Sequence, residues 1–345
     1  MKSQLIYSTF FWSVAFVFLF QCSPFDCLAQ KSKEVKSILD EIISHAEESS
    51  LYRDGVDWNS VKQEMYALAE EADSISQLKP ALELMLNELN DTHGRVFHNN
   101  QYLAYHTGNR PSRPDGFDWD VYTDIQSAQV YPFIAENLEN EIGYVRIVGL
   151  PMGDNQKMSN DIQDAVCEII KNGATKWIID LRYNGGGNMF PMVEGLTSII
   201  GDGPVGGTKG VTEEESSVWK IEDGDFYYDE QNVAIDNRCP LEELPKIAVL
   251  TSSYTASSGE ALAVILKGRP DTRFFGNNSY GMITATDYHP IDKSTVMSIS
   301  VSYYKDRSGK VYTTNVDVDE EIRFVPAASL PSDLAVAAAK NWLIR

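Results

Sequence analysis

The spacing of apolar residues divides the chain into a helical first part and a mixed second part. Between residues 31 and 91, apolar residues recur every three or four positions, which is typical of amphipathic helices. Three helices are predicted, over the beginning of this segment, over 57–71 and over 76–89, with Asp57 as the N-cap of the second. Residues 92–142 lack this period, and the proline- and glycine-rich run 109–116 predicts a turn or a linker.

From about residue 142, short apolar runs alternate with helical periods. Strands are predicted over 143–147, 176–181, 247–250, 272–275 and 295–304, and helices over 160–172, 189–200 and 261–266. Strand, turn and helix repeated in this way predict an α/β core with a mainly parallel sheet, whose functional turns follow the carboxyl ends of strands. The acidic segment 201–245, rich in glycine and tyrosine, is predicted to be an insertion in this core.

The first 29 residues have the features of a secretory signal. Lys2 supplies a positive charge, an apolar stretch runs from Leu5 to Phe20, and Cys27-Leu28-Ala29 resembles a cleavage site. We therefore expect an exported protein, periplasmic or extracellular. An uncleaved anchor and a lipid attached to Cys22 are the alternatives, although the residues before Cys22 are not the small ones typical of lipid attachment.

Composition and charge narrow the classes of function. Of the 345 residues, 43% are hydrophobic and 23% are charged. A chain of this length and composition can bury the core of one large domain or of two domains. After a signal over 1–29, we expect a helical subdomain over 30–98, a linker or small subdomain over 99–141 and the α/β core over 142–345. The net charge of −21 disfavours nucleic acids and anionic membranes as partners, because both repel a negative surface, and mildly favours basic substrates.

Cys167 and Cys239 are the cysteines that remain after the predicted cleavage. An exported chain could pair them. Cys167 also lies on the apolar face of a predicted helix, where a buried thiol would fit equally well, so both alternatives stay open. No spacing of cysteine and histidine is typical of a metal site, and no metal or other cofactor is expected.

Three segments carry groups that could do chemistry. The run 254–260, Tyr-Thr-Ala-Ser-Ser-Gly-Glu, joins a predicted strand to a predicted helix, where a serine could be a nucleophile or simply a helix cap. The run 180–187, Asp-Leu-Arg-Tyr-Asn-Gly-Gly-Gly, follows another strand, and its glycine N–H groups could bind a developing oxyanion. A serine nucleophile needs a base, for which His93 is the first candidate and His289 the alternative.

These segments, in this order, resemble the tail-specific (C-terminal-processing) serine peptidase family, whose members share a Clp-protease/crotonase-like α/β core. Residues 180–187 match its Asp-Leu-Arg-x-Asn-x-Gly-Gly motif, and 276–281 match its Gly-x-x-(Ser/Thr)-(Tyr/Phe)-Gly motif. In the family the nucleophile stands three residues before a glutamate, which implies Ser257.

Departures from the family pattern indicate which branch this chain resembles. Met282 occupies the position of the lysine base, so a Ser–Lys dyad is excluded there. The branch similar to the tricorn core protease uses a histidine after a small hydroxyl residue, which implies His93 as the base with Thr92 helping to hold its ring. The orienting glutamate of that branch has no aligned equivalent, and its substitutes would come from the acidic residues Asp317, Asp319 and Glu320. The linker 99–141 is too short for the PDZ domain of the lysine branch.

The resemblance implies an exported serine endopeptidase that acts on peptides or proteins. Ser257 would form the acyl-enzyme and His93 would act as general base. The backbone N–H groups of Ser258 and of Gly186 or Gly187 would bind the oxyanion. Without an aligned orienting acid, we expect reduced activity, and the alternative is a weakly active or inactive homologue that binds an apolar ligand or a peptide. An acyl-CoA enzyme of the crotonase type is disfavoured by export.

Overall fold

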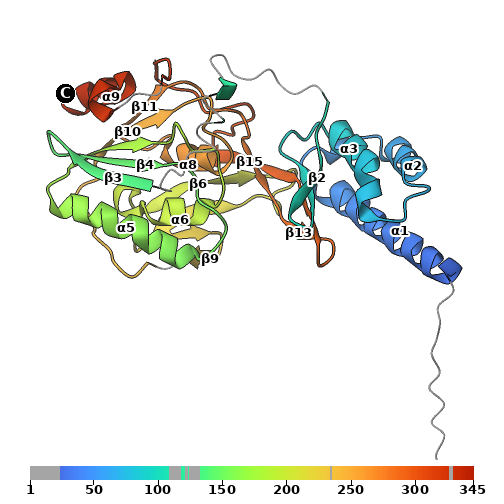
Figure 1. Cartoon of the computed structure of the whole chain (residues 1–345). Helices are drawn as coiled ribbons and strands as arrows, with labels where there is room; N and C mark the ends of the chain where they lie inside the picture. Colours follow the sequence, from blue (N-terminus) through green and yellow to red (C-terminus); the bar gives the residue numbers. More distant parts are fainter. Residues whose placement is uncertain (1–23, 109–117, 121–122, 124–132, 234, 326–328) are drawn as a thin grey trace, which may run out of the picture.

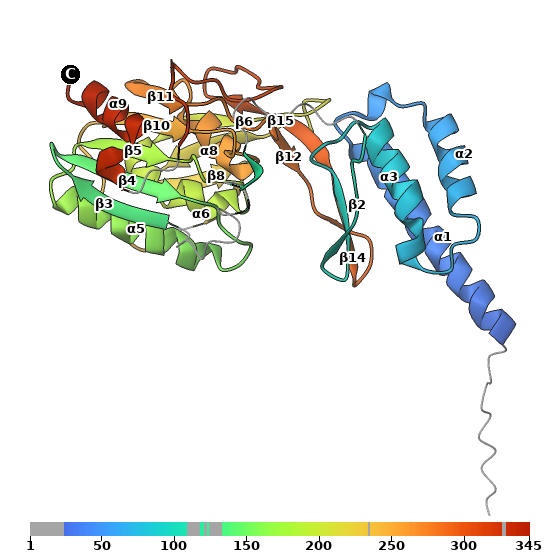
Figure 2. The same cartoon turned by 45° about the horizontal axis from the view of Figure 1, so that its top comes forward.

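The computed structural model describes residues 24–108, 118–120, 123, 133–233, 235–325 and 329–345, so most of the predicted signal lies outside the described residues. Two lobes are visible, a small helical lobe and a large α/β lobe (Figure 1). Strands of the C-terminal half run from one lobe into the other (Figure 2).

The helical lobe is built on the three predicted helices. They are α1 (Pro24–Ser49), α2 (Trp58–Leu68) and α3 (Lys79–Glu88), with short 3-10 turns at Arg53–Gly55 and Ile75–Leu78. Asp57 caps α2 as predicted, because its side chain accepts a hydrogen bond from the Ser60 N–H. The backbone of α1 is helical across the predicted cleavage position after Ala29.

A four-stranded antiparallel sheet completes this lobe. Its strands are β1 (Arg95–His98), β2 (Gln101–Tyr105), β13 (His289–Pro290) and β14 (Thr295–Ser298), in the order β13-β14-β1-β2. Leu39 and Leu82 of the helices share one buried cluster with Val96 and Met297 of the sheet. The lobe therefore needs residues from far along the chain, and the predicted subdomain 30–98 is only part of it.

The α/β lobe contains a six-stranded sheet in which parallel pairing joins every strand except β3. Its strands are β3 (Phe133–Leu138), β4 (Ile142–Ile147), β5 (Lys176–Asp180), β10 (Lys246–Thr251), β11 (Thr272–Gly276) and β16 (Glu320–Glu321), in the order β16-β11-β10-β5-β4-β3. Helix α9 (Leu334–Leu343), which the sequence analysis missed, packs on one face. Helix α5 (Asn155–Lys171) packs on the other face.

The α/β lobe contains a second six-stranded sheet, which is entirely antiparallel. Its strands are β6 (Gly203–Lys209), β7 (Val218–Glu222), β8 (Asp225–Tyr228), β9 (Gln231–Val233), β12 (Thr284–Thr286) and β15 (Ser300–Asp306), in the order β12-β15-β6-β7-β8-β9. Trp219 and Phe226 share a buried cluster with Val249 and Leu262. The segment 201–245, predicted as an insertion, is thus a layer of the core.

Helices α6 (Met189–Glu194), α7 (Thr197–Ile200) and α8 (Ser258–Leu266) belong to the same core as the two sheets. All nine residues of α8 are buried, which explains why its sequence is apolar without a helical period. The single helix predicted over 189–200 is divided between Glu194 and Thr197.

The strand predicted over 295–304 is also divided. Its first half is β14 of the helical lobe, its second half is β15 of the core lobe, and Ile299 lies between them. This crossing strand ties the helical lobe to the core lobe, because the Leu51 N–H of the helical lobe donates to the Ser300 carbonyl at 2.8 Å.

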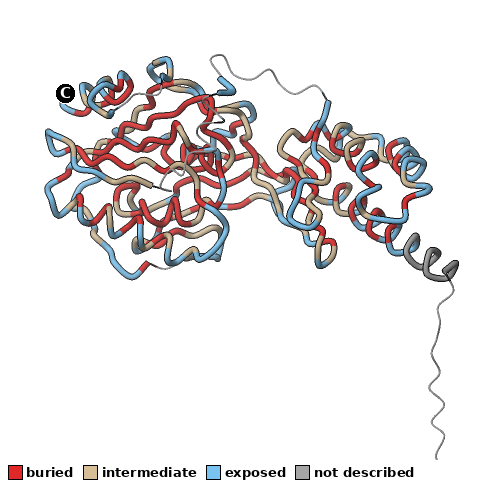
Figure 3. The backbone as a smooth tube through the Cα atoms, in the orientation of Figure 1, coloured by how far each residue is buried: buried red, intermediate tan, exposed pale blue. Residues whose placement is uncertain are grey.

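Burial follows this organisation, with buried backbone concentrated in the two lobe interiors (Figure 3). Cys167 and Cys239 form a disulfide, which resolves the two alternatives that the sequence left open.

In the part of the chain that the structure describes, no helix has the length and apolar character needed to cross a membrane. The same residues contain no group of three or more acidic, histidine or cysteine side chains arranged to hold a metal ion.

Candidate active site

Ser257 lies in the turn between β10 and α8, at the carboxyl end of a central parallel strand. It is the N-cap residue of α8, with φ 54° and ψ −120°, an unusual conformation for a residue with a side chain. It is also the one half-exposed residue between Thr251 and Glu260, where all its neighbours are buried. Backbone strain of this kind at a strand-to-helix turn exposes the nucleophile of α/β-hydrolases.

Glu260 holds the serine turn from beneath. One carboxyl oxygen accepts the Ser257 N–H at 2.9 Å, and the other accepts the Gly281 N–H at 2.8 Å and the Ser279 hydroxyl at 2.5 Å. Burial raises the pKa of this fully buried carboxyl to about 7, while the hydrogen bonds act in the opposite direction. Glu260 thus connects the nucleophile turn to the segment 279–281.

The glycine turn 185–187 lies directly against the serine turn. The Ala256 N–H donates to the Asn184 carbonyl at 2.9 Å, and the Ser258 hydroxyl donates to the Gly187 carbonyl at 2.6 Å. Gly186 has φ +108°, and a Cβ at this position would lie 2.8 Å from Ser257 Cβ and 3.2 Å from Ser257 Oγ. A glycine is therefore required here both for the backbone conformation and for the space beside the serine.

The three predicted oxyanion donors differ in their hydrogen bonding. Of the two glycine alternatives, Gly186 already has an acceptor, because its N–H donates to Asn184 Oδ1 at 3.0 Å. Among the described residues, the N–H groups of Gly187 and Ser258 have no acceptor. These two groups are the ones free to bind an oxyanion.

The Asp-Leu-Arg part of the glycine motif is structural. Arg182 is buried and bonds to Asp180 and Asp333 at 2.7 and 2.8 Å. Although burial acts against ionisation, the Arg182 guanidinium lowers the pKa of Asp180. The ion pairs anchor the strand end from which the glycine turn begins, on the side of α9.

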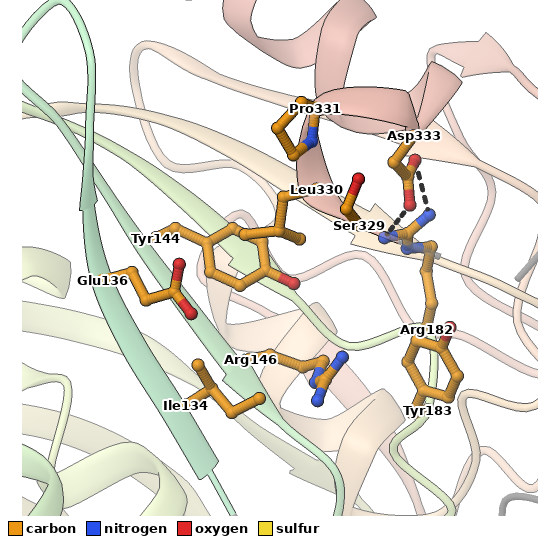
Figure 4. A pocket seen from close by; sticks show the side chains of 10 residues that line it. All are labelled: Ile134, Glu136, Tyr144, Arg146, Arg182, Tyr183, Ser329, Leu330, Pro331 and Asp333. Atoms are coloured by element: carbon orange, nitrogen blue, oxygen red, sulfur yellow. Dashed lines mark hydrogen bonds and ion pairs between the residues drawn. The ribbon is translucent and has the colours of Figure 1, made fainter. Parts of the chain in front are cut away.

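A cavity of about 390 Å³ opens on that same side (Figure 4). Its walls are Ile134, Glu136, Tyr144, Arg146, Arg182, Tyr183, Ser329, Leu330, Pro331 and Asp333. The Arg146 guanidinium lies over the Tyr183 ring, 5.3 Å from its centre. Neither Ser257 nor His93 lines this cavity, so it is separate from the candidate catalytic groups.

His93 lies on the loop between α3 and β1. Its Nδ1 is 3.0 Å from the hydroxyl oxygen of Thr284, the first residue of β12, and its backbone N–H donates to Asp91 at 3.1 Å. Burial lowers the pKa of His93 to about 4, an effect that the Asp91 carboxylate opposes and Arg95 reinforces. The ring is therefore neutral at pH 7, as a general base must be.

One short segment, 279–284, contacts both Glu260 of the serine turn and the His93 ring. Ser279 and Gly281 bond to Glu260 beneath Ser257, and Thr284, three residues later, bonds to His93. Within the described residues, no hydrogen bond joins Ser257 to His93 directly. The segment 279–284 nevertheless links the serine turn to the His93 ring through hydrogen bonds.

The remaining candidates have other partners. Thr92 accepts a bond from Arg95 through its carbonyl, and the hydroxyl at the imidazole is that of Thr284, so the role of Thr92 stays a prediction. The His289 ring stacks on the His45 ring in the helical lobe, with 3.8 Å between the ring centres.

The three acidic residues proposed as orienting groups also bond elsewhere. Asp317 pairs with Lys310 at 3.5 Å, Asp319 accepts the Phe274 N–H at 2.7 Å, and Glu320 pairs with Arg273 at 3.2 Å. These contacts hold the edge of the parallel sheet. Asp91, Thr284 and Ser300, which do lie around His93, were missed by the sequence analysis. Of these three, only Asp91 could have been noticed in the sequence, because it stands two residues before the histidine.

Comparison with known proteins identifies the family of the chain. The family model of peptidase family S41 matches residues 141–324, which include the serine turn and the glycine turn but not His93. The nisin-resistance protein of Lactococcus lactis subsp. lactis is 23% identical over 272 residues, 78% of this chain and 77% of its own length. The chloroplastic C-terminal processing peptidase of Tetradesmus obliquus is 24% identical over 212 residues, 61% of this chain and 40% of its own length.

Solved structures share the fold over nearly the whole chain. A lipoprotein from Streptococcus agalactiae superposes with a TM-score of 0.66 at 18% identity, covering 91% of this chain and 96% of its own. The photosystem II D1 C-terminal processing protease gives a TM-score of 0.56 at 16% identity, covering 89% and 97%. The chain therefore belongs to peptidase family S41, the family of the C-terminal processing peptidases, and is a serine-type peptidase.

Proposed function

We propose that the protein is an exported endopeptidase with Ser257 as nucleophile and His93 as general base. The observation that carries this proposal is Ser257 itself, a strained, half-exposed residue in an otherwise buried turn. Beside it lie the unoccupied N–H groups of Gly187 and Ser258, where the charge of a tetrahedral intermediate would develop.

The reaction would follow acyl transfer to serine. Ser257 Oγ attacks the carbonyl carbon of the peptide bond while His93 Nε2 takes the hydroxyl proton. The intermediate collapses, the C–N bond breaks, and His93 returns the proton to the leaving amine. Water, deprotonated by the same imidazole, then hydrolyses the ester and frees Ser257.

Several features support the finer parts of this proposal. The Cys167–Cys239 disulfide suits an oxidising compartment, and a lipoprotein is among the structural neighbours, both in line with export. Parallel pairing around β10 suits a Clp-protease/crotonase-like core. The net charge of −21 favours encounter with basic peptides.

A fluorophosphonate probe, which reacts with activated serines, tests the assignment. Labelling of the wild-type protein should occur at Ser257, and Ser257→Ala should reduce peptide cleavage by about three orders of magnitude or more. Ser253→Ala, in the same turn, is the matched control and should keep both the labelling by the probe and the cleavage of peptides. Unchanged cleavage by Ser257→Ala, or binding of an apolar ligand by a protein that the probe never labels, would overturn the proposal.

A further inference from the structure

We propose that Asp91, Ser300 and Thr284 form a hydrogen-bonded chain that positions the His93 ring and determines which ring nitrogen carries the proton. The chain would take the place of the orienting acid that the sequence does not align. This inference rests on the proposed role of His93 as base, and all three residues are positioning residues rather than catalytic ones.

The contacts form a continuous path from the imidazole to a buried carboxylate. His93 Nδ1 is 3.0 Å from Thr284 Oγ1, which is 2.9 Å from Ser300 Oγ, which in turn is 2.7 Å from Asp91 Oδ1. Asp91 and Ser300 are fully buried, and Thr284 is nearly so. The path is therefore shielded from water, where each hydrogen bond is stronger and better oriented than at the surface.

Asp91 can only accept hydrogen bonds in this arrangement. Its Oδ1 accepts the backbone N–H of Gly94 at 2.8 Å and that of His93 at 3.1 Å, and its Oδ2 accepts the backbone N–H of Ser300 at 2.8 Å. Backbone N–H groups cannot accept a proton, so both carboxylate oxygens face donors. The Ser300 hydroxyl must then donate its proton to Asp91.

This requirement gives the whole path one direction. Because Ser300 donates to Asp91, its oxygen is left to accept the proton of the Thr284 hydroxyl. The Thr284 oxygen must then accept from His93, which places the imidazole proton on Nδ1. Nε2 is left with a free lone pair, the state that a base needs to take the proton of Ser257.

The path also joins the two lobes of the molecule. Asp91 and His93 lie on a loop of the helical lobe, whereas Thr284 and Ser300 begin two paired strands of the core lobe. The contact between His93 and Thr284 spans 191 residues of sequence, and the contact between Asp91 and Ser300 spans 209. Docking of the lobes and activation of the base are thus one event.

Thr284→Val is the most direct test, because it removes one hydroxyl at nearly constant shape. We expect the rate of fluorophosphonate labelling at Ser257 to fall at least about tenfold, and by no more than the roughly 10²–10⁴ that a general base contributes as a whole. Thr284→Ser should restore most of the rate. Thr208→Val is the matched control, since it breaks a similar buried pair with Ser217 at 2.9 Å in the core sheet, and it should keep the wild-type rate.

A second readout follows the proton directly. In ¹⁵N-histidine spectra, with His93 assigned by its absence in His93→Gln, the wild-type protein should show the Nδ1–H tautomer at neutral pH. Thr284→Val, which keeps the backbone carbonyl of residue 284 but loses the hydroxyl, should lower the share of the Nδ1–H tautomer. This spectrum needs no substrate, and a residue with a merely structural role would not change it.

The outcomes separate this inference from the proposed function. If Ser257 is labelled but Thr284→Val keeps both the wild-type rate and the Nδ1–H tautomer, the chain has no positioning role and the inference is wrong. If Thr284→Val fails to fold, Ser300→Ala gives the same test from the next link. If Ser257→Ala leaves cleavage unchanged, the proposed function itself fails, whatever the tautomer of His93.

Discussion

The serine turn and the histidine loop bear the two groups of the proposed site, and they are held in different ways. Ser257 is fixed by Glu260, three residues away, and by the neighbouring glycine turn of the same sheet. The His93 ring is fixed by Thr284 and, through it, by Ser300, both distant in sequence and both on the other lobe. The nucleophile is thus a local structure, whereas the base depends on how two lobes dock.

This difference teaches which half of the site is robust. A strand-to-helix turn inside a fully buried core persists as long as the core is folded. A loop held by three hydroxyl and carboxylate contacts between lobes is lost when those lobes separate, even slightly. We therefore expect perturbations of the core to abolish the nucleophile and perturbations of the lobe contact to reduce the activity of the base.

The largest expected effect is on the nucleophile side. Gly186→Ala would place a methyl group 2.8 Å from Ser257 Cβ, at a φ of +108° that alanine avoids. We expect the labelling rate to fall by about 10²–10³, comparable to the loss of an oxyanion donor. Gly173→Ala has a similar φ, +95°, with no atom within 4 Å, and controls for backbone strain alone. Equal rates in the two variants would contradict the close packing.

Replacement of the buried carboxyl beneath Ser257 should act on stability. At pH 8, where the wild-type carboxyl is ionised and accepts from all its partners, Glu260→Gln presents an amide N–H₂ to groups that are themselves donors, so we expect a loss of about 1–3 kcal/mol in the free energy of unfolding. Urea titrations monitored by circular dichroism measure it.

The pH dependence of that loss gives a sharper check. Burial raises the pKa of Glu260 from 4.5 to about 7, so the folded state holds an additional proton between these values. The contribution is complete below pH 4.5 and is lost as the pH rises through 7. Glutamine does not titrate, so the gap between wild type and Glu260→Gln should narrow from pH 5 to pH 8. A constant gap would contradict the raised pKa.

The histidine side predicts an unusual acid limb. Because the pKa of His93 is lowered to about 4, the imidazole remains neutral as the pH falls from 7 to 5. An ordinary histidine, with a pKa of about 6.5, would keep only about 3% of its neutral form at pH 5. We expect the labelling rate to stay nearly constant over this range and to fall below about pH 4. A rate that already halves near pH 6.5 would contradict the lowered pKa of His93.

The smallest expected effect concerns the lobe contact. Arg53 of the helical lobe pairs with Glu215 of the core lobe at 2.6 Å. Removing this partly exposed pair by Arg53→Met should weaken docking by about 1 kcal/mol or less and slow labelling by up to about fivefold. Lys157→Met, which removes a pair with Asp161 within α5, is the control. A rate unchanged in both variants would mean that docking does not depend on this pair.

The sequence by itself determined the parts of the protein that depend on neighbouring residues. Apolar spacing identified the helices of the first lobe and the strand–turn–helix units that carry Ser257 and the glycine turn. These elements could be predicted because their cause is local, in periodicity, capping and the conformational freedom of glycine. The same motifs were sufficient to place the chain in its family.

Only the tertiary structure decided how the chain is layered and how the base is held. Segment 201–245 is a layer of the core because Trp219 and Phe226 pack in its buried apolar cluster. The strand predicted over 295–304 is divided between the sheets of the two lobes. The pairing of Cys167 with Cys239 and the path from Asp91 to His93 also join residues far apart in sequence. Such contacts cannot be recognised from a period or a spacing in the sequence, because they depend on how elements distant in the chain pack together.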